Sequence, residues 1–322
     1  MKKKKTTTIL TAILFSLFML TSCSDDDNNV VAPSNTIADF VAANADYSSL
    51  GAALDRVNLT GVLAGTTNYT VFAPNNAAFD AFLTANNFAS LEAVPVDVLT
   101  QVLLNHVVSG VNTSSSLTTG YIETLAEEAT TGNKLNMYVN TSAGVLLNGI
   151  STVTTADVTV DNGVIHAVNE VITLPTVVTF ATADSTFGIL VDALTRETSF
   201  TYVSTLSTTG SPSPFTVFAP TDAAFVDLLA ELDGVTTLAD IPTATLEATL
   251  NTHVVAGANV LASTLTDGMT VNTLGDNFTI NTVGGASFTD LNDRSGDIIV
   301  TDVQAVNGVI HVVNKVILPN LN

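Results

Sequence analysis

The sequence predicts two successive α+β domains that are copies of one another. Residues 70–79 read TVFAPNNAAF and residues 216–225 read TVFAPTDAAF, with eight of ten positions identical. Residues 162–172 and 307–317 read NGVIHAVNEVI and NGVIHVVNKVI, with nine of eleven identical. The two pairs are displaced by 146 and 145 residues, and a repeat of that length is a duplicated domain rather than a solenoid. Helical patterns precede strand patterns in each copy, which favours an α+β fold.

Each copy is predicted to open with an amphipathic helix followed by a short strand. The apolar residues at helical spacing are Tyr47, Leu50, Leu54 and Val57 in copy one and Phe187, Leu190, Val191 and Leu194 in copy two. The strand, at residues 70–72 and 216–218, stops at Ala-Pro because proline cannot continue a central strand. We expect this block to be structural, through Thr70, Phe72, Pro74, Thr216, Phe218 and Pro220.

The remaining elements follow in the same order in both copies. Asn75 and Thr221 are placed to cap the next helix. A mid-domain helix then carries Leu99, Val102, Leu103 and His106 in copy one, and Leu246, Leu250 and His253 in copy two. Strands rich in Thr and Val come next, separated by Gly and Asn turns. The last strand is predicted over 164–172 and 309–317, with the structural histidines His166 and His311 within it.

The N-terminus predicts export and lipidation. Lys2 to Lys5 precede an apolar run at 9–20 that is too short to span a bilayer and reads as a signal peptide over 1–22. The following Leu-Thr-Ser-Cys resembles a bacterial lipobox. Cys23, the only cysteine in the chain, is therefore the expected lipidation site. An ordinary signal peptide with a chance cysteine is the alternative.

Charge restricts the partners of the protein. Lys2 to Lys5 are four of nine basic residues, so the rest of the chain carries five against 30 acidic residues. Such a surface repels nucleic acid and anionic lipid, so we expect membrane attachment by the lipid alone. The acidic tether at 23–35 resembles an export signal for surface display, which predicts an outer-membrane lipoprotein exposed on the cell surface. A location facing the periplasm is the alternative.

The two repeated blocks and the intervening helix that ends in His-Val-Val resemble the fasciclin domain. The resemblance covers 36–175 and 176–319 and implies two tandem domains, each a β-wedge or sandwich packed with several short helices. It also implies a non-catalytic function in cell adhesion or in binding matrix. Its partner-binding motifs fall on Asn105, His106, Asp157, Val158, Thr252, His253, Asp302 and Val303. The tyrosine that precedes the histidine in animal members is absent in both copies, which argues against an integrin partner.

Other chemistry is not favoured by the residues. The four histidines lie far apart in sequence, without the close pairs of zinc motifs, and their apolar spacing predicts buried imidazoles bonded to backbone. Residues 290–297 (DLNDRSGD) form the best calcium candidate, but a polar hairpin turn is the preferred interpretation. We expect no catalytic residue, metal or cofactor.

Three functions remain open from the sequence. The favoured one is a surface adhesion protein that binds an unidentified protein or glycan on matrix or neighbouring cells, with two modules raising avidity. The second is an accessory protein that binds a glycan or protein partner in an envelope or uptake assembly. The third is a hydrolase with a pair of carboxylates, since 30 acidic residues make chance pairs unavoidable.

Overall fold

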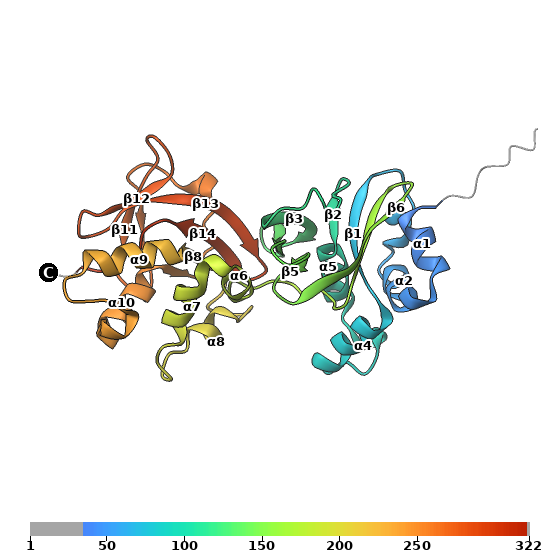
Figure 1. Ribbon diagram of the computed structural model, residues 1–322, viewed down its shortest axis with the longest axis horizontal. Coiled ribbons are helices and arrows are strands. Elements are labelled where there is room, and N and C mark those ends of the chain that lie inside the picture. Colours follow the sequence, from blue (N-terminus) through green and yellow to red (C-terminus); the bar gives the residue numbers. More distant parts are fainter. Residues whose placement is uncertain (1–34, 321–322) are drawn as a thin grey trace, which may run out of the picture. The chain divides into compact units, whose positions relative to one another are not determined.

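The computed structural model describes residues 35–320, and within them the two copies fold into matching sets of helices and strands (Figure 1). The predicted signal peptide, Cys23 and nearly all of the predicted tether lie outside the described residues. The first copy contains α1 (Ile37–Ala43), η1 (Ala45–Tyr47), α2 (Ser48–Arg56), α3 (Thr60–Leu63), β1 (Tyr69–Pro74), α4 (Asn76–Ala85), η2 (Leu91–Ala93), α5 (Val96–Asn105), β2 (Val107–Ser109), β3 (Gly120–Glu127), β4 (Lys134–Asn140), β5 (Leu146–Leu147), β6 (Ser151–Val160) and β7 (Gly163–Val168).

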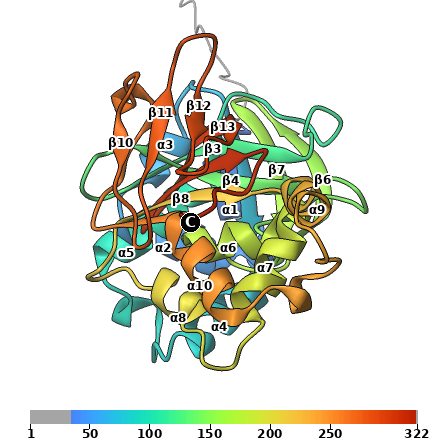
Figure 2. The same ribbon diagram turned by 90° about the vertical axis from the view of Figure 1, so that its left-hand side faces the viewer.

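The second copy repeats this order after a short connection. It contains α6 (Val177–Ala183), η3 (Ser185–Phe187), α7 (Gly188–Thr195), α8 (Tyr202–Leu206), β8 (Phe215–Pro220), α9 (Asp222–Glu231), η4 (Leu238–Asp240), α10 (Thr243–Thr252), β9 (Val254–Ala256), η5 (Ala262–Thr264), β10 (Thr270–Val271), β11 (Phe278–Asn281), β12 (Ser287–Thr289), β13 (Ser295–Ala305) and β14 (Gly308–Val313). Figure 2 shows α7, α8 and α10 gathered on one side of this copy, away from β11 and β12. The predicted α+β class is confirmed.

Each copy is organised around one seven-stranded sheet. The strand orders are β2-β1-β7-β6-β5-β4-β3 and β10-β11-β12-β13-β14-β8-β9. The two sequence blocks that define the repeat lie side by side, because β1 pairs in parallel with β7 and β8 with β14. In this register Phe72 lies opposite His166, and Phe218 lies opposite His311. The two blocks therefore form one parallel strand pair within the sheet of each domain.

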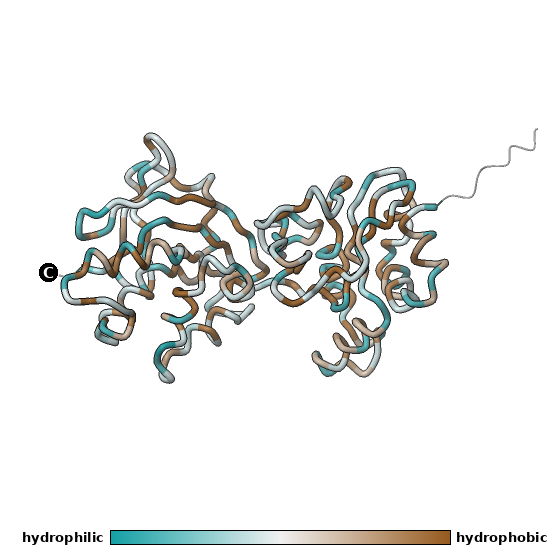
Figure 3. The backbone as a smooth tube through the Cα atoms, viewed as in Figure 1, coloured by the Kyte–Doolittle hydropathy of each residue, from teal (hydrophilic) through white to brown (hydrophobic). Residues whose placement is uncertain are grey.

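The strand of the first sequence block, β1 or β8, separates two hydrophobic clusters in each copy. In β1, Val71 and Ala73 pack with the helices, whereas Phe72 packs on the opposite face with strands β4 and β7. This follows from the alternation of side chains along a strand. Every residue of β8 is buried, and β1 is buried from Thr70 onward. Hydrophobic stretches accordingly run along helices and strands in both copies (Figure 3).

The closing strand is shorter than the sequence predicts. β7 ends at Val168 and β14 at Val313, not at Ile172 and Ile317. Asn169 turns the chain out of the sheet, since its side chain accepts a hydrogen bond from the Thr152 amide while its own amide donates to the Thr152 carbonyl. Ile172 follows outside the strand and is fully buried. The predicted helix caps are confirmed, with Asn75 accepting from the Ala78 amide and Thr221 from the Ala224 amide.

The two copies contact one another through the outer strands of the first. Asp184 lies between the hydroxyls of Tyr121 on β3 and Tyr138 on β4, which donate to its two carboxylate oxygens at 2.9 and 3.3 Å. The Tyr121 ring also meets Phe180 of α6 edge-on. Burial and the Asp184 carboxylate raise the pKa of Tyr138 to about 12. The tyrosines therefore remain protonated donors at neutral pH.

Within residues 35–320, no single helix is both long and apolar enough to cross a membrane. The segments 177–183 and 185–195 pass that test of length and composition only when taken together, and they meet at a bend of 91°.

Candidate functional site

The histidine at the end of each mid-domain helix is a structural connection inside the domain. His106 follows α5 and is only 2% exposed. Its Nε2 accepts a hydrogen bond from the Ile172 amide at 2.8 Å, and its Nδ1 therefore carries the proton and donates to the Val102 carbonyl at 2.7 Å. Burial lowers the pKa of His106 to about 4. The ring is neutral at pH 7 and holds the segment after β7 against α5.

His253 repeats this arrangement in the second copy. Its Nδ1 lies 2.7 Å from the Thr249 carbonyl, and its Nε2 accepts from the Ile317 amide at 2.9 Å. Burial lowers its pKa to about 4 as well. The apolar-face spacing of these histidines thus predicts their environment correctly: a buried imidazole bonded to backbone.

The residue before each histidine is also used internally. Asn105 is fully buried, and its amide donates to the carbonyls of Ile172 and Thr173 while its oxygen accepts from Thr124. Thr252 is fully buried too, and its hydroxyl donates to the Ala248 carbonyl. Four of the eight expected partner-binding residues, Asn105, His106, Thr252 and His253, are consequently closed to direct contact with a partner in this fold.

The Asp-Val pairs lie on β-bulges of the strand next to the closing strand. Asp157 and Asp302 have φ values of 62° and 60°, and the pairing register shifts beside them in β6 and β13. Each bulge directs its amide to a histidine on the neighbouring strand, with the Asp157 amide 3.2 Å from Nδ1 of His166 and the Asp302 amide 3.3 Å from Nδ1 of His311. A left-handed position suits aspartate better than a branched residue.

The aspartate carboxylates hold the loop that follows β2 in the first copy and β9 in the second. Asp157 accepts hydrogen bonds from the amide and hydroxyl of Ser114, which lower the pKa of its carboxyl. Asp302 accepts from the Ala262 amide at 2.8 Å. Asp157 itself remains exposed, Val158 and Asp302 are half-buried, and Val303 is buried. Of the expected partner-binding residues, Asp157 is the most accessible.

The strand residues that were expected to be structural also hold this loop against the sheet. The Thr70 hydroxyl donates to the Gly110 carbonyl and accepts from the Asn112 amide, and His166 Nε2 lies 2.9 Å from the Asn112 carbonyl. Phe72 stacks on the His166 ring at 5.4 Å. In the second copy Thr216, Phe218 and His311 make the matching contacts, with Ala258 and Val260 in the loop. Pro74 and Pro220 are the last residues of β1 and β8.

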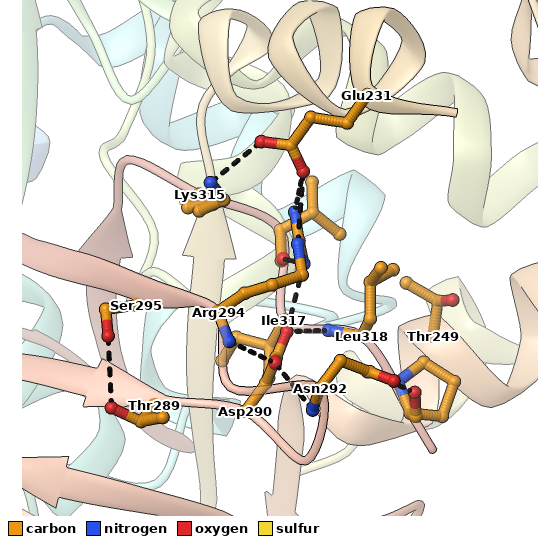
Figure 4. Close-up of polar contacts among 12 residues, drawn as sticks. Glu231, Thr249, Thr289, Asp290, Asn292, Arg294, Ser295, Lys315, Ile317 and Leu318 are labelled. Atoms are coloured by element: carbon orange, nitrogen blue, oxygen red, sulfur yellow. Dashed lines mark hydrogen bonds and ion pairs between the residues drawn. The ribbon is translucent and has the colours of Figure 1, made fainter. Parts of the chain in front are cut away.

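The 290–297 segment is a hairpin turn whose acidic group is already bound by protein (Figure 4). The Asp290 side chain is fully buried and accepts from the amides of Asn292, Arg294 and Leu318 and from the Arg294 guanidinium at 2.9 Å. Arg294 also pairs with Glu231, which in turn pairs with Lys315. Within residues 35–320, no group of three His, Cys, Asp or Glu side chains is arranged to hold a metal ion. The preferred hairpin interpretation of this segment agrees with the structure.

Two features of the structure were not predicted from the sequence. One is the contact of Tyr121 and Tyr138 with Asp184, because only the relative placement of the two copies brings these residues together. The other is a groove between α1 and α2, whose signal in the sequence is a glycine, Gly51, in the middle of an amphipathic helix.

The geometry described above defines a class: a duplicated α+β domain in which a parallel strand pair carries the two signature blocks and buried histidines connect the sheet to its loops. The fasciclin domain matches this chain twice, over residues 45–175 and 185–319. The chain belongs to the fasciclin-domain family, as its resemblance implied. Fasciclin domains are linked to cell adhesion and to extracellular matrix proteins.

Similar proteins come from distant organisms. Protein sll1483 of Synechocystis is 34% identical over 140 residues, covering 44% of this chain and 74% of the relative. Human periostin is 29% identical over 205 residues, covering 62% of this chain and 22% of periostin. Among solved structures, a FAS1 domain pair from the insect cell adhesion molecule fasciclin I covers 84% of this chain and 93% of that one, with 19% identity and a TM-score of 0.46.

Proposed function

We propose that this protein is a non-catalytic adhesion protein, anchored by a lipid on Cys23 and displayed on the cell surface. The observation that carries the proposal is that fasciclin domains account for residues 45–175 and 185–319. The lipobox-like sequence before Cys23 supports the anchor, and the acidic tether supports surface display.

The use of the histidines supports binding rather than catalysis. All four histidines of the chain are bonded to backbone groups: His106 and His253 at the helix ends, His166 and His311 on the closing strands. Burial lowers the pKa of His106, His253 and His311. A general base needs a ring near its transition between charge states and within reach of substrate, and these rings serve the fold instead.

A test of display and attachment uses the chain in its own cells. Intact cells are treated with protease and probed with an antibody against residues 180–319, with a periplasmic protein as leakage control. Loss of the signal is expected. Attachment of the same cells to a matrix-coated surface is then compared with that of a deletion strain and of a strain carrying Cys23→Ala, which keeps both domains but removes the anchor. Attachment should require the wild-type gene and Cys23.

Two results would overturn the proposal. Survival of the antibody signal until the outer membrane is broken would place the domains inside the envelope. Equal attachment of the deletion strain would remove the adhesive function and leave the accessory-protein alternative.

A further inference from the structure

The first domain carries an open groove between α1 and α2 with a volume of about 420 Å³. That volume lies in the range of sites that hold a ligand or a side chain of a partner. Its floor is apolar, with Val41 and Leu54 buried beneath it and Ala38 beside them. Its rim carries the polar residues Asn44, Ser48, Asp55 and Thr60, together with three exposed alanines, Ala42, Ala45 and Ala52. The groove is therefore shaped for a group with an aliphatic body and a polar end.

A glycine keeps this groove open without a structural need for it. Gly51 lies in the middle of α2, where glycine is a poor helix former. A Cβ added at Gly51 would meet only Val41 Cγ1, at an ordinary contact distance of 3.5 Å. Its φ does not require glycine either, since the residue is helical. A residue that weakens its helix and fills no packing requirement is typical of a functional position.

The second copy carries different side chains at the positions equivalent to the groove. α2 reads SSLGAALDR, and residues 188–196 read GILVDALTR, so Val191 replaces Gly51 and Thr195 replaces Asp55. The alignment is supported by Arg56 and Arg196, which donate to carbonyls of the equivalent η2 and η4 segments. The space of about 40 Å³ that α6 and α7 border in the second copy lies inside the core instead, where β8 and α10 also line it and nearly all of its lining is apolar.

Charge indicates what the open groove takes. Asp55 is exposed, and its Oδ1 accepts a hydrogen bond from the Thr60 hydroxyl. The neighbouring cation, Arg56, is directed away, to the carbonyls of Leu91 and Glu92. Each of the five cations in residues 35–320 is likewise held by carbonyls or carboxylates: Arg56, Lys134, Arg196, Arg294 and Lys315. The surface thus presents negative charge to a partner.

We propose that this groove binds a basic segment of a protein partner, and that the second copy does not. The aliphatic stem of a lysine or arginine lies on the floor formed by Val41 and Leu54, and its cationic end reaches Asp55. Long basic side chains routinely bury such stems along apolar surface. Among the residues that the structure describes, no aromatic ring lines the groove to receive the apolar face of a sugar. The proposal rests on the proposed function and assigns the partner contact to the first domain.

The test measures binding of synthetic peptides to the purified chain at physiological ionic strength. One peptide alternates lysine with alanine. The other replaces lysine with 2,3-diaminopropionate, which keeps a side-chain amine but has almost no aliphatic stem. Gly51→Val introduces the residue of the second copy, and Asp55→Asn removes the charge. Asp227→Asn, at an exposed position on α9 of the second domain, removes the same charge elsewhere and is the matched control.

The lysine peptide should bind the wild type, and Gly51→Val and Asp55→Asn should each weaken it about tenfold while Asp227→Asn changes it less than about twofold. The short-stemmed peptide should bind the wild type about tenfold more weakly. Thermal unfolding of Gly51→Val should match or exceed that of the wild type, because valine fits at the equivalent helical position.

Three results would overturn the groove assignment: no binding of the lysine peptide, equal binding by Gly51→Val, or equal binding of both peptides. The last two would show uniform attraction to an acidic surface. Cell attachment separates this from the proposed function. Equal attachment of cells that carry the wild type and cells that carry Gly51→Val would refute the groove assignment and leave the proposed adhesive function in place. If cells with the wild-type protein do not attach although the purified chain binds the lysine peptide in the groove, the adhesive function is refuted and the groove assignment stands.

Discussion

Nε2 of His106 accepts a hydrogen bond from the Ile172 amide at 2.8 Å. This hydrogen bond connects the end of helix α5 to the segment that leaves the sheet after β7. His253 and Ile317 form the same connection in the second copy at 2.9 Å. Because Ile172 and Ile317 no longer pair in a strand, the histidine supplies the acceptor that a strand neighbour would otherwise give. The histidine of the His-Val-Val motif is thus explained by the fold.

Replacing His106 by alanine is expected to lower the free energy of unfolding by about 3 kcal/mol, since it leaves both the Ile172 amide and the Val102 carbonyl buried without a partner. Urea denaturation measures the change. His253→Ala should behave alike. Thr84→Ala, on the exposed end of α4, is the control and should change little. A loss as small as that of the control would contradict the structural assignment of the histidine.

Stability should fall as the pH is lowered from about 6.5 to about 4. The pKa of His106 and of His253 is about 4 in the folded chain because both rings are buried. In the unfolded chain each ring titrates near 6.5. The unfolded state therefore binds more protons in this window, so the contribution is complete above it and declines toward its acid end. Urea midpoints across the window measure the decline.

Carboxylates also titrate near pH 4, so the histidine rings are followed directly. The NMR signals of His106 and His253 should show no protonation between pH 7 and about 5. A ring that titrates at its ordinary pKa would show that it is open to water, contrary to the structure.

Tyr121→Phe should destabilise the chain by about 1 kcal/mol, because it removes one of the hydroxyl groups that bind the buried Asp184 carboxylate. Asp184→Asn alone should also destabilise the chain. In a double-mutant cycle the two changes should be non-additive, since both remove the same contact. Additive losses would mean that Tyr121 and Asp184 do not interact in solution.

Arg294→Ala should cost about 3 kcal/mol, because the fully buried Asp290 carboxylate loses its cationic partner. Lys134→Ala removes an exposed ion pair with Glu127 and should cost less than about 1 kcal/mol. Thermal unfolding compares the two. Added Ca²⁺ should leave the midpoint of the wild type unchanged, and a calcium-dependent increase that Arg294→Ala alters would revive the calcium interpretation of residues 290–297.

The small apolar space in the second domain should accept larger side chains. Val177 and Ala181 border it, whereas the first domain has Ile37 and Val41 at the equivalent positions. The double change Val177→Ile and Ala181→Val should raise the free energy of unfolding by about 1 kcal/mol. The reverse pair, Ile37→Val and Val41→Ala, should lower it by about 2 kcal/mol. Loss of stability in the filled variant would show that the space is not available to these side chains.

The sequence by itself determined the duplication, the α+β class and the helix caps. These are local or repeated signals: the identical blocks at 70–79 and 216–225, and caps at Asn75 and Thr221 that act within one turn of the helix. Burial of His106 also followed from the sequence, because apolar residues at helical spacing mark the face that packs inward.

Only the tertiary structure decided which residues remain for a partner. Asn105 and Thr252 are polar and suggest a surface, yet both are buried. The segment after the closing strand covers Asn105, and the chain at Gly275 and Asp276 lies against Thr252. The end of β7 at Val168 depends on Asn169 bonding Thr152, seventeen residues away. The groove beside Gly51 depends on how α1 packs on α2. Such contacts join distant parts of the chain, and local secondary-structure propensity does not predict them.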